Sequence, residues 1–127
     1  MNTLAALAKK HDGVELGYVY IMEYNFKQGS KIKTLYKVGV TQNQPIDRML
    51  QISRSFFQSR RYVPESRLIR FRKVPDYYTL EKQLHKILKS HNYLFKTSFD
   101  GSTEFFDIEL DKLLVEYEDK VPLLKKK

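Results

Sequence analysis

The order of apolar and polar residues along this chain predicts two strands joined by a tight turn, then helices and one further strand. Aromatic and β-branched residues dominate residues 16–26 and 32–40. The segment Lys27-Gln28-Gly29-Ser30 between them has the composition of a turn, which predicts an antiparallel hairpin. Pro45 suits a first helical turn and Asp76 suits a helix N-cap, and apolar residues follow each of them at helical spacing. In order, the predicted elements are a helix over 3–10, strands over 16–26 and 32–40, a helix over 45–55, a strand over 67–74, a helix over 77–91 and a helix over 109–119.

Length and composition fit one folded α/β domain over residues 1–127 and exclude several other classes. Of its 127 residues, 42% are apolar and 30% are charged, which is typical of a globular protein with one modest core. No apolar run approaches the roughly 18 residues that cross a bilayer, and the N-terminus does not resemble a signal peptide. The lack of cysteine excludes disulfides, thiolate zinc sites and a cysteine nucleophile. We therefore expect a cytoplasmic protein without a membrane partner.

The distribution of charge changes this picture, because it favours a polyanionic partner. The formal net charge is +8, and nucleic acid is a better candidate than an anionic membrane surface. Residues 48–73 contain eight Lys or Arg against the single acid Glu65, whereas residues 107–119 contain six acids against Lys112 alone. The basic stretch is where a phosphate backbone would lie. The residues predicted to bind nucleic acid are Arg54, Arg60, Arg61, Arg67, Arg70, Arg72 and Lys73.

Two side chains of the predicted hairpin could take part in phosphodiester chemistry. Because side chains alternate along a strand, Tyr20 lies on one face of its strand, and Lys37 shares a face with Leu35 and Gly39. If the two strands pair in the matching register, Lys37 and Tyr20 lie on the same side of the sheet. An ammonium there would lower the pKa of the phenol or contact a scissile phosphate.

Two more candidates fall on the predicted helices. The guanidinium of Arg48 could grip a phosphate with two hydrogen bonds and stabilise the charge of a five-coordinate transition state. Glu81 is the strongest candidate to hold a hard cation, since magnesium often takes one or two protein carboxylates and keeps several waters. His85 lies four residues after Glu81 and could share its helix face, although the further ligands of a closed zinc site are not evident.

Taken in order, these motifs resemble the GIY-YIG nuclease superfamily over about residues 16–108. Gly17-Tyr18-Val19-Tyr20-Ile21 resembles the first motif of that superfamily. Lys37-Val38-Gly39, followed by Thr41, resembles the second motif in a phage and bacterial branch that carries Lys-Ile-Gly there. Thr103-Glu104-Phe105-Phe106 resembles a late motif of the same branch. The resemblance implies an α+β fold with a three-stranded antiparallel sheet flanked by helices, to which an N-terminal helix and an acidic C-terminal helix are appended.

The resemblance also implies an activity and a role for each residue. It implies a divalent-metal-dependent DNA endonuclease of a bacterium or a phage-infected cell, and without a second DNA-binding domain we expect little sequence specificity. Tyr20 would be the general base, Lys37 and Arg48 would handle phosphate charge, Glu81 would hold Mg²⁺ or Mn²⁺, and His85 would assist as a proton relay. The lysine in the second motif leaves open which group activates water.

Two other functions remain open at this point. The fold could serve as a catalytically inactive nucleic-acid-binding or regulatory module, in which the basic stretch binds the backbone and Glu81 has no role. It could also be a protein-interaction module that uses the acidic C-terminal helix. Each candidate residue taken singly also has an ordinary structural explanation, such as core packing for Tyr20 and a solvated surface position for Lys37 or Arg48.

Overall fold

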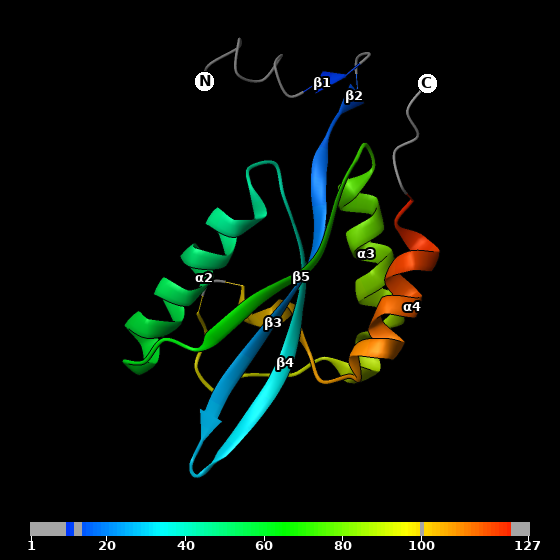
Figure 1. Cartoon of the computed structure of the whole chain (residues 1–127). Helices are drawn as coiled ribbons and strands as arrows, with labels where there is room; N and C mark the ends of the chain where they lie inside the picture. The colour runs from blue at the N-terminus through cyan, green and yellow to red at the C-terminus, as the bar shows by residue number, and fades with distance from the viewer. Residues whose placement is uncertain (1–9, 12–13, 100, 123–127) are drawn as a thin grey trace.

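The protein is built around one twisted antiparallel sheet, as a computed structural model describes it for residues 10–11, 14–99 and 101–122 (Figure 1). The sheet has four strands in the order β5-β3-β4-β6. Strands β1 (Lys10–His11) and β2 (Val14–Glu15) form a separate two-stranded pair. The elements of the main fold are β3 (Gly17–Gln28), β4 (Lys31–Thr41), α2 (Pro45–Arg60), β5 (Glu65–Val74), α3 (Tyr77–Ile87), β6 (Phe105–Phe106) and α4 (Leu110–Lys120), with 3₁₀ turns at Lys89–His91 and Ser102–Glu104.

The hairpin of β3 and β4 forms as the sequence predicts, and its register brings the candidate residues to one face. Tyr20 pairs with Gly39, and Met22 pairs with Lys37. Tyr20 and Lys37 are therefore diagonal neighbours on the same side of the sheet. The turn between the strands contains Gly29 at a φ of 64°, a left-handed conformation that glycine adopts without strain.

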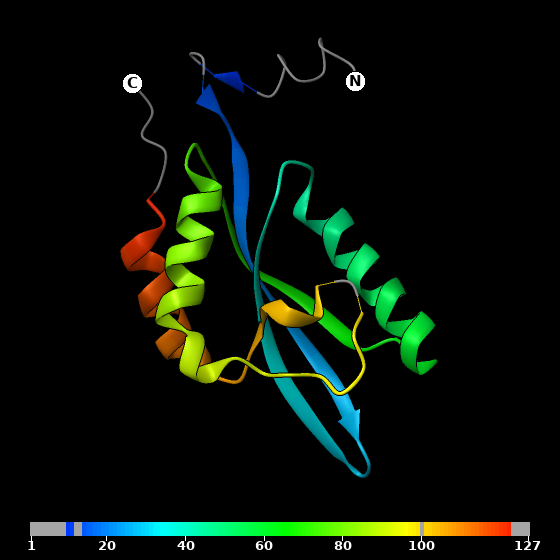
Figure 2. The ribbon, with the colours of Figure 1, turned by 180° about the vertical axis from the view of Figure 1, so that it is seen from behind.

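Helices cover both faces of the sheet, and each face has its own apolar core. Helix α2 lies against one face, and α3 and α4 lie against the other, as Figures 1 and 2 show from opposite sides. The core on the first face, called here the α2-side core, consists of Tyr20, Met22, Tyr24, Phe26, Leu35, Met49, Ile52, Phe56 and Phe105. The core on the second face includes Val19, Ile21, Val38, Leu84, Leu113 and Tyr117. Alternate residues of β3 thus enter opposite cores, which is why the strand is continuously apolar and buried from Val19 to Met22.

The prediction of an antiparallel sheet with flanking helices is correct, but the sheet has four strands rather than three. The additional strand, β6, has only two residues, which pair with Tyr36 and Lys37 of β4. A strand of two residues is too short to show the alternation of apolar and polar residues that identifies a strand in a sequence. The two phenylalanines that form β6 predict only that they are buried. Both are indeed buried, Phe105 in the α2-side core and Phe106 in the other.

Several predicted boundaries also change. The predicted helix over 3–10 lies outside the described residues except for Lys10, which is in a strand. Helix α2 runs to Arg60 and ends at Arg61 in a left-handed conformation, so it is longer than predicted. Helix α3 ends at Ile87 and is followed by the 3₁₀ turn. The Asp76 side chain makes no capping hydrogen bond. Three α-helices are present in the described part of the chain, compared with about four predicted.

Candidate active site

The candidate site lies where β4 becomes an edge strand. Because β6 pairs only with Tyr36 and Lys37, the carbonyl of Val38 has no strand partner on that side. The Nε2 atom of His85, on α3, lies 2.7 Å from this carbonyl oxygen. A carbonyl can only accept, so Nε2 must carry the proton in this contact, and Nδ1 is the ring nitrogen that keeps a lone pair. The side of the His85 ring packs on Phe106, with ring centroids 5.3 Å apart. Helix α3 is thereby held at the sheet edge.

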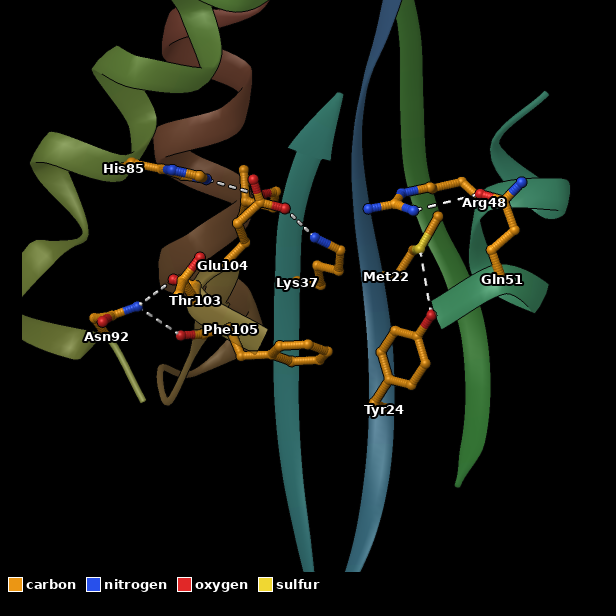
Figure 3. A network of polar contacts seen from close by, with 11 residues as sticks. Met22, Tyr24, Lys37, Arg48, Gln51, His85, Asn92, Thr103, Glu104 and Phe105 are labelled. Carbon is orange, nitrogen blue, oxygen red and sulfur yellow. Dashed lines mark hydrogen bonds and ion pairs between the residues drawn. The ribbon is translucent and has the colours of Figure 1, made fainter. Parts of the chain in front are cut away.

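Lys37 is fully buried and forms an ion pair with Glu104, so the interpretation of Lys37 as a solvated strand lysine is wrong. Figure 3 shows its ammonium between the sheet and the Glu104 carboxylate. Its Nζ also lies 5.8 Å from the ring centroid of Tyr20 and 5.9 Å from that of Phe105. Burial lowers the pKa of Lys37, and the Glu104 carboxylate opposes that shift.

Gly101 explains how the loop that carries Glu104 can close over this lysine. A Cβ atom at Gly101 would lie 3.0 Å from both Cε and Nζ of Lys37. Its φ of 82° is also in the left-handed region, which disfavours any other residue. Glycine at this position therefore allows the Ser102–Glu104 turn to deliver Glu104 to the buried ammonium.

Glu81, His85 and Glu104 form a group that could hold a metal ion. One potential ligand atom from each lies within 4.8 Å of the others. Ligands about 2.0–2.2 Å from an ion are at most about 4.4 Å apart, so a shift of a few tenths of an ångström would complete the coordination. Burial raises the pKa of Glu81 to about 7, and the nearby Glu104 carboxylate raises it as well, so Glu81 is protonated in a substantial fraction of molecules near neutral pH. A cation would take the place of that proton. The donor set fits a divalent metal.

Tyr20 is completely buried beside this group, and its environment opposes ionisation. Among the described residues its hydroxyl has no hydrogen-bond partner that meets strict geometry. Burial raises the pKa of Tyr20 above its ordinary value, the Glu104 carboxylate raises it further, and the Arg48 guanidinium acts in the opposite direction. The phenol is therefore protonated at neutral pH in this structure, and its pKa is raised by burial instead of being lowered by Lys37 as expected.

Gly39 determines where the Tyr20 ring lies. A Cβ atom at Gly39 would come within 2.4 Å of the Tyr20 hydroxyl oxygen. The ring therefore lies flat over the backbone of β4, in space that any side chain at position 39 would fill. This close approach is the physical reason for a glycine after Lys37-Val38.

Arg48 approaches the same face from the first turn of α2. Its Nη1 atom donates a hydrogen bond to Oε1 of Gln51 at 3.3 Å. Figure 3 shows the guanidinium extended from the helix toward β3, on the side where Lys37 approaches from β4. Its electrostatic influence reaches both Tyr20 and Lys37. The structure thus brings together all five residues that the sequence singled out for chemistry: Tyr20, Lys37, Arg48, Glu81 and His85.

The seven residues predicted to bind nucleic acid are not gathered on one surface. Arg70 and Arg72 of β5 both form ion pairs with Glu118 of α4, on the opposite face of the sheet from Tyr20. Arg67 pairs with Glu23 at 3.0 Å. On the α2 side, Arg54 is exposed, and Lys73 is exposed with its Nζ 5.8 Å from the ring centroid of Tyr18.

The two remaining arginines lie at the end of α2. Arg60 stacks on Phe56, Phe95 and Phe99 at 4.8 to 5.4 Å and donates to the Thr97 carbonyl at 2.9 Å. Arg61 is exposed and ends the helix. The acidic helix α4 therefore neutralises part of the basic stretch within the molecule, whereas Arg48, Arg54 and Lys73 lie on the α2 side.

Sequence reasoning missed Glu104 as a functional residue. Its segment was interpreted as a motif of the family or as core, and the acid in it was given no role. The available signal was one carboxylate next to two buried aromatic residues, in a chain with a lysine in an otherwise apolar strand. A buried lysine requires a nearby carboxylate, but the sequence alone does not say which one.

The fold and the site together define a small α+β protein with two carboxylates and a histidine at the edge of its sheet, beside a buried lysine. The T5orf172 domain family model matches residues 17–119, and the chain belongs to this family. The assignment to the GIY-YIG superfamily is therefore wrong, since the family that matches is a different one. No curated protein and no solved structure matches the chain significantly. In the described part of the chain, no helix combines the length and apolar character needed to span a membrane.

Proposed function

We propose that this protein is a divalent-metal-dependent DNA endonuclease with little sequence specificity of its own. Membership of the T5orf172 domain family is consistent with a nuclease-like or DNA-binding role. The observation that carries the proposal is the close group of Glu81, His85 and Glu104, which lies against the buried ammonium of Lys37. A carboxyl group with a raised pKa beside a second carboxylate and a buried ammonium is an arrangement that structural stability alone does not require.

Glu81 would be the principal metal ligand, with Glu104 and a ring nitrogen of His85 as the further donors. Mg²⁺ or Mn²⁺ held there would polarise a phosphoryl oxygen and lower the pKa of a bound water. The two carboxylates suit such hard cations, whereas the imidazole also suits Zn²⁺. The proton on Glu81 would leave as the ion binds, so we expect metal binding to become stronger as the pH rises through about 7.

The cations of the site would bind the scissile phosphate. Arg48 is partly exposed and presents a guanidinium to the same face of the sheet, so it would position the phosphate and stabilise its additional charge. Lys37 is buried and ion-paired, so its first role is to hold Glu104 in place. The Tyr20 hydroxyl would donate a hydrogen bond to a substrate oxygen or to the attacking water. As a proton acceptor it would first need its pKa lowered by substrate or metal.

The test is cleavage of supercoiled plasmid in the presence of Mg²⁺, Mn²⁺ or Zn²⁺, with Glu81→Gln as the decisive variant. We expect nicking that requires a divalent metal and falls at least about 100-fold in Glu81→Gln, because the amide loses the charge that binds the ion. Glu116→Gln, an isosteric change on α4, is the matched control and should cleave at the normal rate. Equal metal-dependent cleavage by Glu81→Gln and the unchanged protein would rule out the assigned metal site.

The second candidate is a catalytically inactive module that binds nucleic acid. It is favoured by the Lys37–Glu104 ion pair, because this pair gives the Glu104 carboxylate a structural role that requires no metal ion. This function predicts DNA binding in EDTA that Glu81→Gln leaves unchanged, together with no cleavage under any metal. The same two variants therefore distinguish the two functions.

A further inference from the structure

A pocket of about 440 Å³ lies on the same face of the sheet as Tyr20, toward the tip of the hairpin. Its walls come from the end of β3, the end of α2 and the loop that follows α3. Figure 2 shows that loop running from α3 across the hairpin toward α2. Five of the residues that line the pocket are aromatic, namely Phe26, Phe56, Tyr62, Tyr93 and Phe95.

Hydrogen bonds hold the two tyrosines in fixed positions. The Tyr62 hydroxyl accepts a hydrogen bond from the backbone N–H of Lys27 at 2.8 Å, and the Tyr93 hydroxyl accepts one from Nε2 of Gln28 at 2.9 Å. The Tyr93 and Phe95 ring centroids are 4.9 Å apart. The rings are partly exposed but ordered, as a stacking platform for a planar ligand must be.

The charge of the lining is entirely positive. Lys27, Arg60 and Lys96 contribute to it, and no carboxylate does so among the described residues that form the pocket. The Arg60 guanidinium is held by the aromatic rings below it and by the Thr97 carbonyl, so its position is fixed before any ligand arrives. Rigid aromatic faces surrounded by cations match a nucleobase joined to phosphates.

We infer that this pocket binds an unpaired nucleotide of a DNA strand whose scissile phosphate lies at the candidate active site. The inference rests on the proposed function and specifies its substrate as DNA with a single-stranded segment beside the cleavage point. From Tyr20 to Phe26 the strand β3 extends about 20 Å, at roughly 3.3 Å per residue. This corresponds to the length of roughly six nucleotides of a duplex strand. The two sites are therefore close enough for one short strand to reach both.

The test measures binding of fluorescein-labelled oligonucleotides in EDTA, where no cleavage takes place. The probes are a 20-nucleotide thymidine strand and a blunt 20-base-pair duplex. We expect Tyr93→Leu to weaken binding of the single strand at least about fivefold, since loss of one stacked base costs that much or more. Lys96→Ala should lower the salt dependence for the single strand by about 0.7 in log–log slope. Neither variant should change duplex binding more than about twofold.

The controls separate this inference from its alternatives. Lys112→Ala removes an exposed lysine from α4 on the other face and should leave both probes unaffected. Circular dichroism establishes that Tyr93→Leu is folded, and Lys96→Ala, at an exposed position, tests the pocket independently of that. Unchanged single-strand binding by both variants, or equal weakening for duplex and single strand, would overturn the inference.

Two further measurements identify the ligand of the pocket and test the proposed function separately. Thymidine monophosphate that displaces the labelled strand at matched nucleotide concentration would show a site for free nucleotides and would overturn the assignment to a strand. Plasmid cleavage by the same variants reports on the proposed function separately. Metal-dependent cleavage that needs Glu81, together with unaltered single-strand binding in the pocket variants, would reject the pocket and leave the nuclease intact.

Discussion

At the scale of single residues, the α2-side core contains two polar groups that a purely structural core would not need. Lys37 is fully buried, and the Tyr20 hydroxyl is buried with no hydrogen bond of strict geometry, although the Arg48 guanidinium lies close enough to lower the pKa of the phenol. Each costs free energy of desolvation that packing does not return. Tyr24, four residues further along the strand and on the same face, provides the comparison, because its hydroxyl donates to the Met49 carbonyl at 3.2 Å.

Replacing the two tyrosines by phenylalanine should therefore have opposite effects on stability. Tyr20→Phe removes a buried hydroxyl that makes no hydrogen bond of strict geometry, so we expect the free energy of unfolding to stay equal or rise by up to about 1 kcal/mol. Tyr24→Phe removes a made hydrogen bond and leaves a buried carbonyl, so we expect a loss of about 1 kcal/mol. Urea unfolding measures both. If the nuclease proposal is correct, Tyr20→Phe also lowers plasmid cleavage while Tyr24→Phe does not. A clear loss of stability in Tyr20→Phe would mean that its hydroxyl has a partner.

At the scale of elements, β5 does not follow a strict alternation of apolar and polar residues, and its pairing with β3 explains why. The pairing of β3 with β5 shifts register between Ile21 and Met22, so that Leu68 and Arg70 pair with consecutive residues of β3 and Ile69 is the extra residue. The bulge changes which side chains face which core. Leu68 packs on the α2-side core, whereas Ile69 and Val74 pack on the other. A strict period of two cannot describe such a strand.

The C-terminal helix is attached to this strand by one carboxylate. Glu118 of α4 pairs with both Arg70 and Arg72, and Arg72 also donates to the Val121 carbonyl at 2.7 Å. The hydrogen bonds from Arg72 and Arg70 lower the pKa of Glu118. One carboxylate of the acidic surface predicted for α4 is thus already paired within the molecule.

Glu118→Gln should lower stability modestly, and the loss should depend on pH. Because the folded-state pKa of Glu118 lies below its unfolded value, its contribution is present above about pH 4.5 and disappears as the pH falls through the folded-state value. We expect at most about 1 kcal/mol at pH 7, since the pairs are partly exposed, and less at 1 M salt. Urea unfolding between pH 3 and 7 measures the difference, with Glu116→Gln on the same helix as the control. A difference that persists unchanged at pH 3 would contradict the ion-pair explanation.

At the scale of the whole molecule, the cations of the basic stretch over residues 48–73 are divided between the two faces of the sheet. On the α4 face the arginines of β5 meet Glu118 and Glu23. On the α2 face, Arg54 and Lys73 are exposed near the candidate site. A phosphate backbone is therefore attracted more strongly to the α2 face than the basic stretch of the sequence suggests.

Salt dependence of duplex binding should distinguish the two sets of cations. If Arg54 and Lys73 each contact a phosphate, then Arg54→Ala and Lys73→Ala should each reduce the log–log slope of affinity against salt concentration by about 0.9. Arg70→Ala should change that slope little, because its charge is already paired with Glu118. The slopes are measured by fluorescence anisotropy in EDTA, at salt concentrations from about 50 to about 300 mM. A larger reduction for Arg70→Ala than for Lys73→Ala would place DNA on the α4 face.

Local pattern alone was enough for a large part of this fold and for much of the candidate site. The hairpin and its faces, the three helices α2, α3 and α4, and the shared side of Tyr20 and Lys37 all follow from alternation, helical spacing and turn composition. These features depend on residues close together in the chain or on one turn. The single-domain organisation and the roles of the site residues remain predictions.

What the sequence by itself determined about this protein is therefore which side chains each element presents, and on which face. Only the tertiary structure decided which of them meet. Lys37 and Glu104 are 67 positions apart, and their contact depends on a two-residue strand and on a glycine that lets the loop close. The pairing of Arg70 and Arg72 with Glu118 likewise spans 46 to 48 positions. Burial and electrostatic energy act on distances in space, and no local period in the chain encodes those distances.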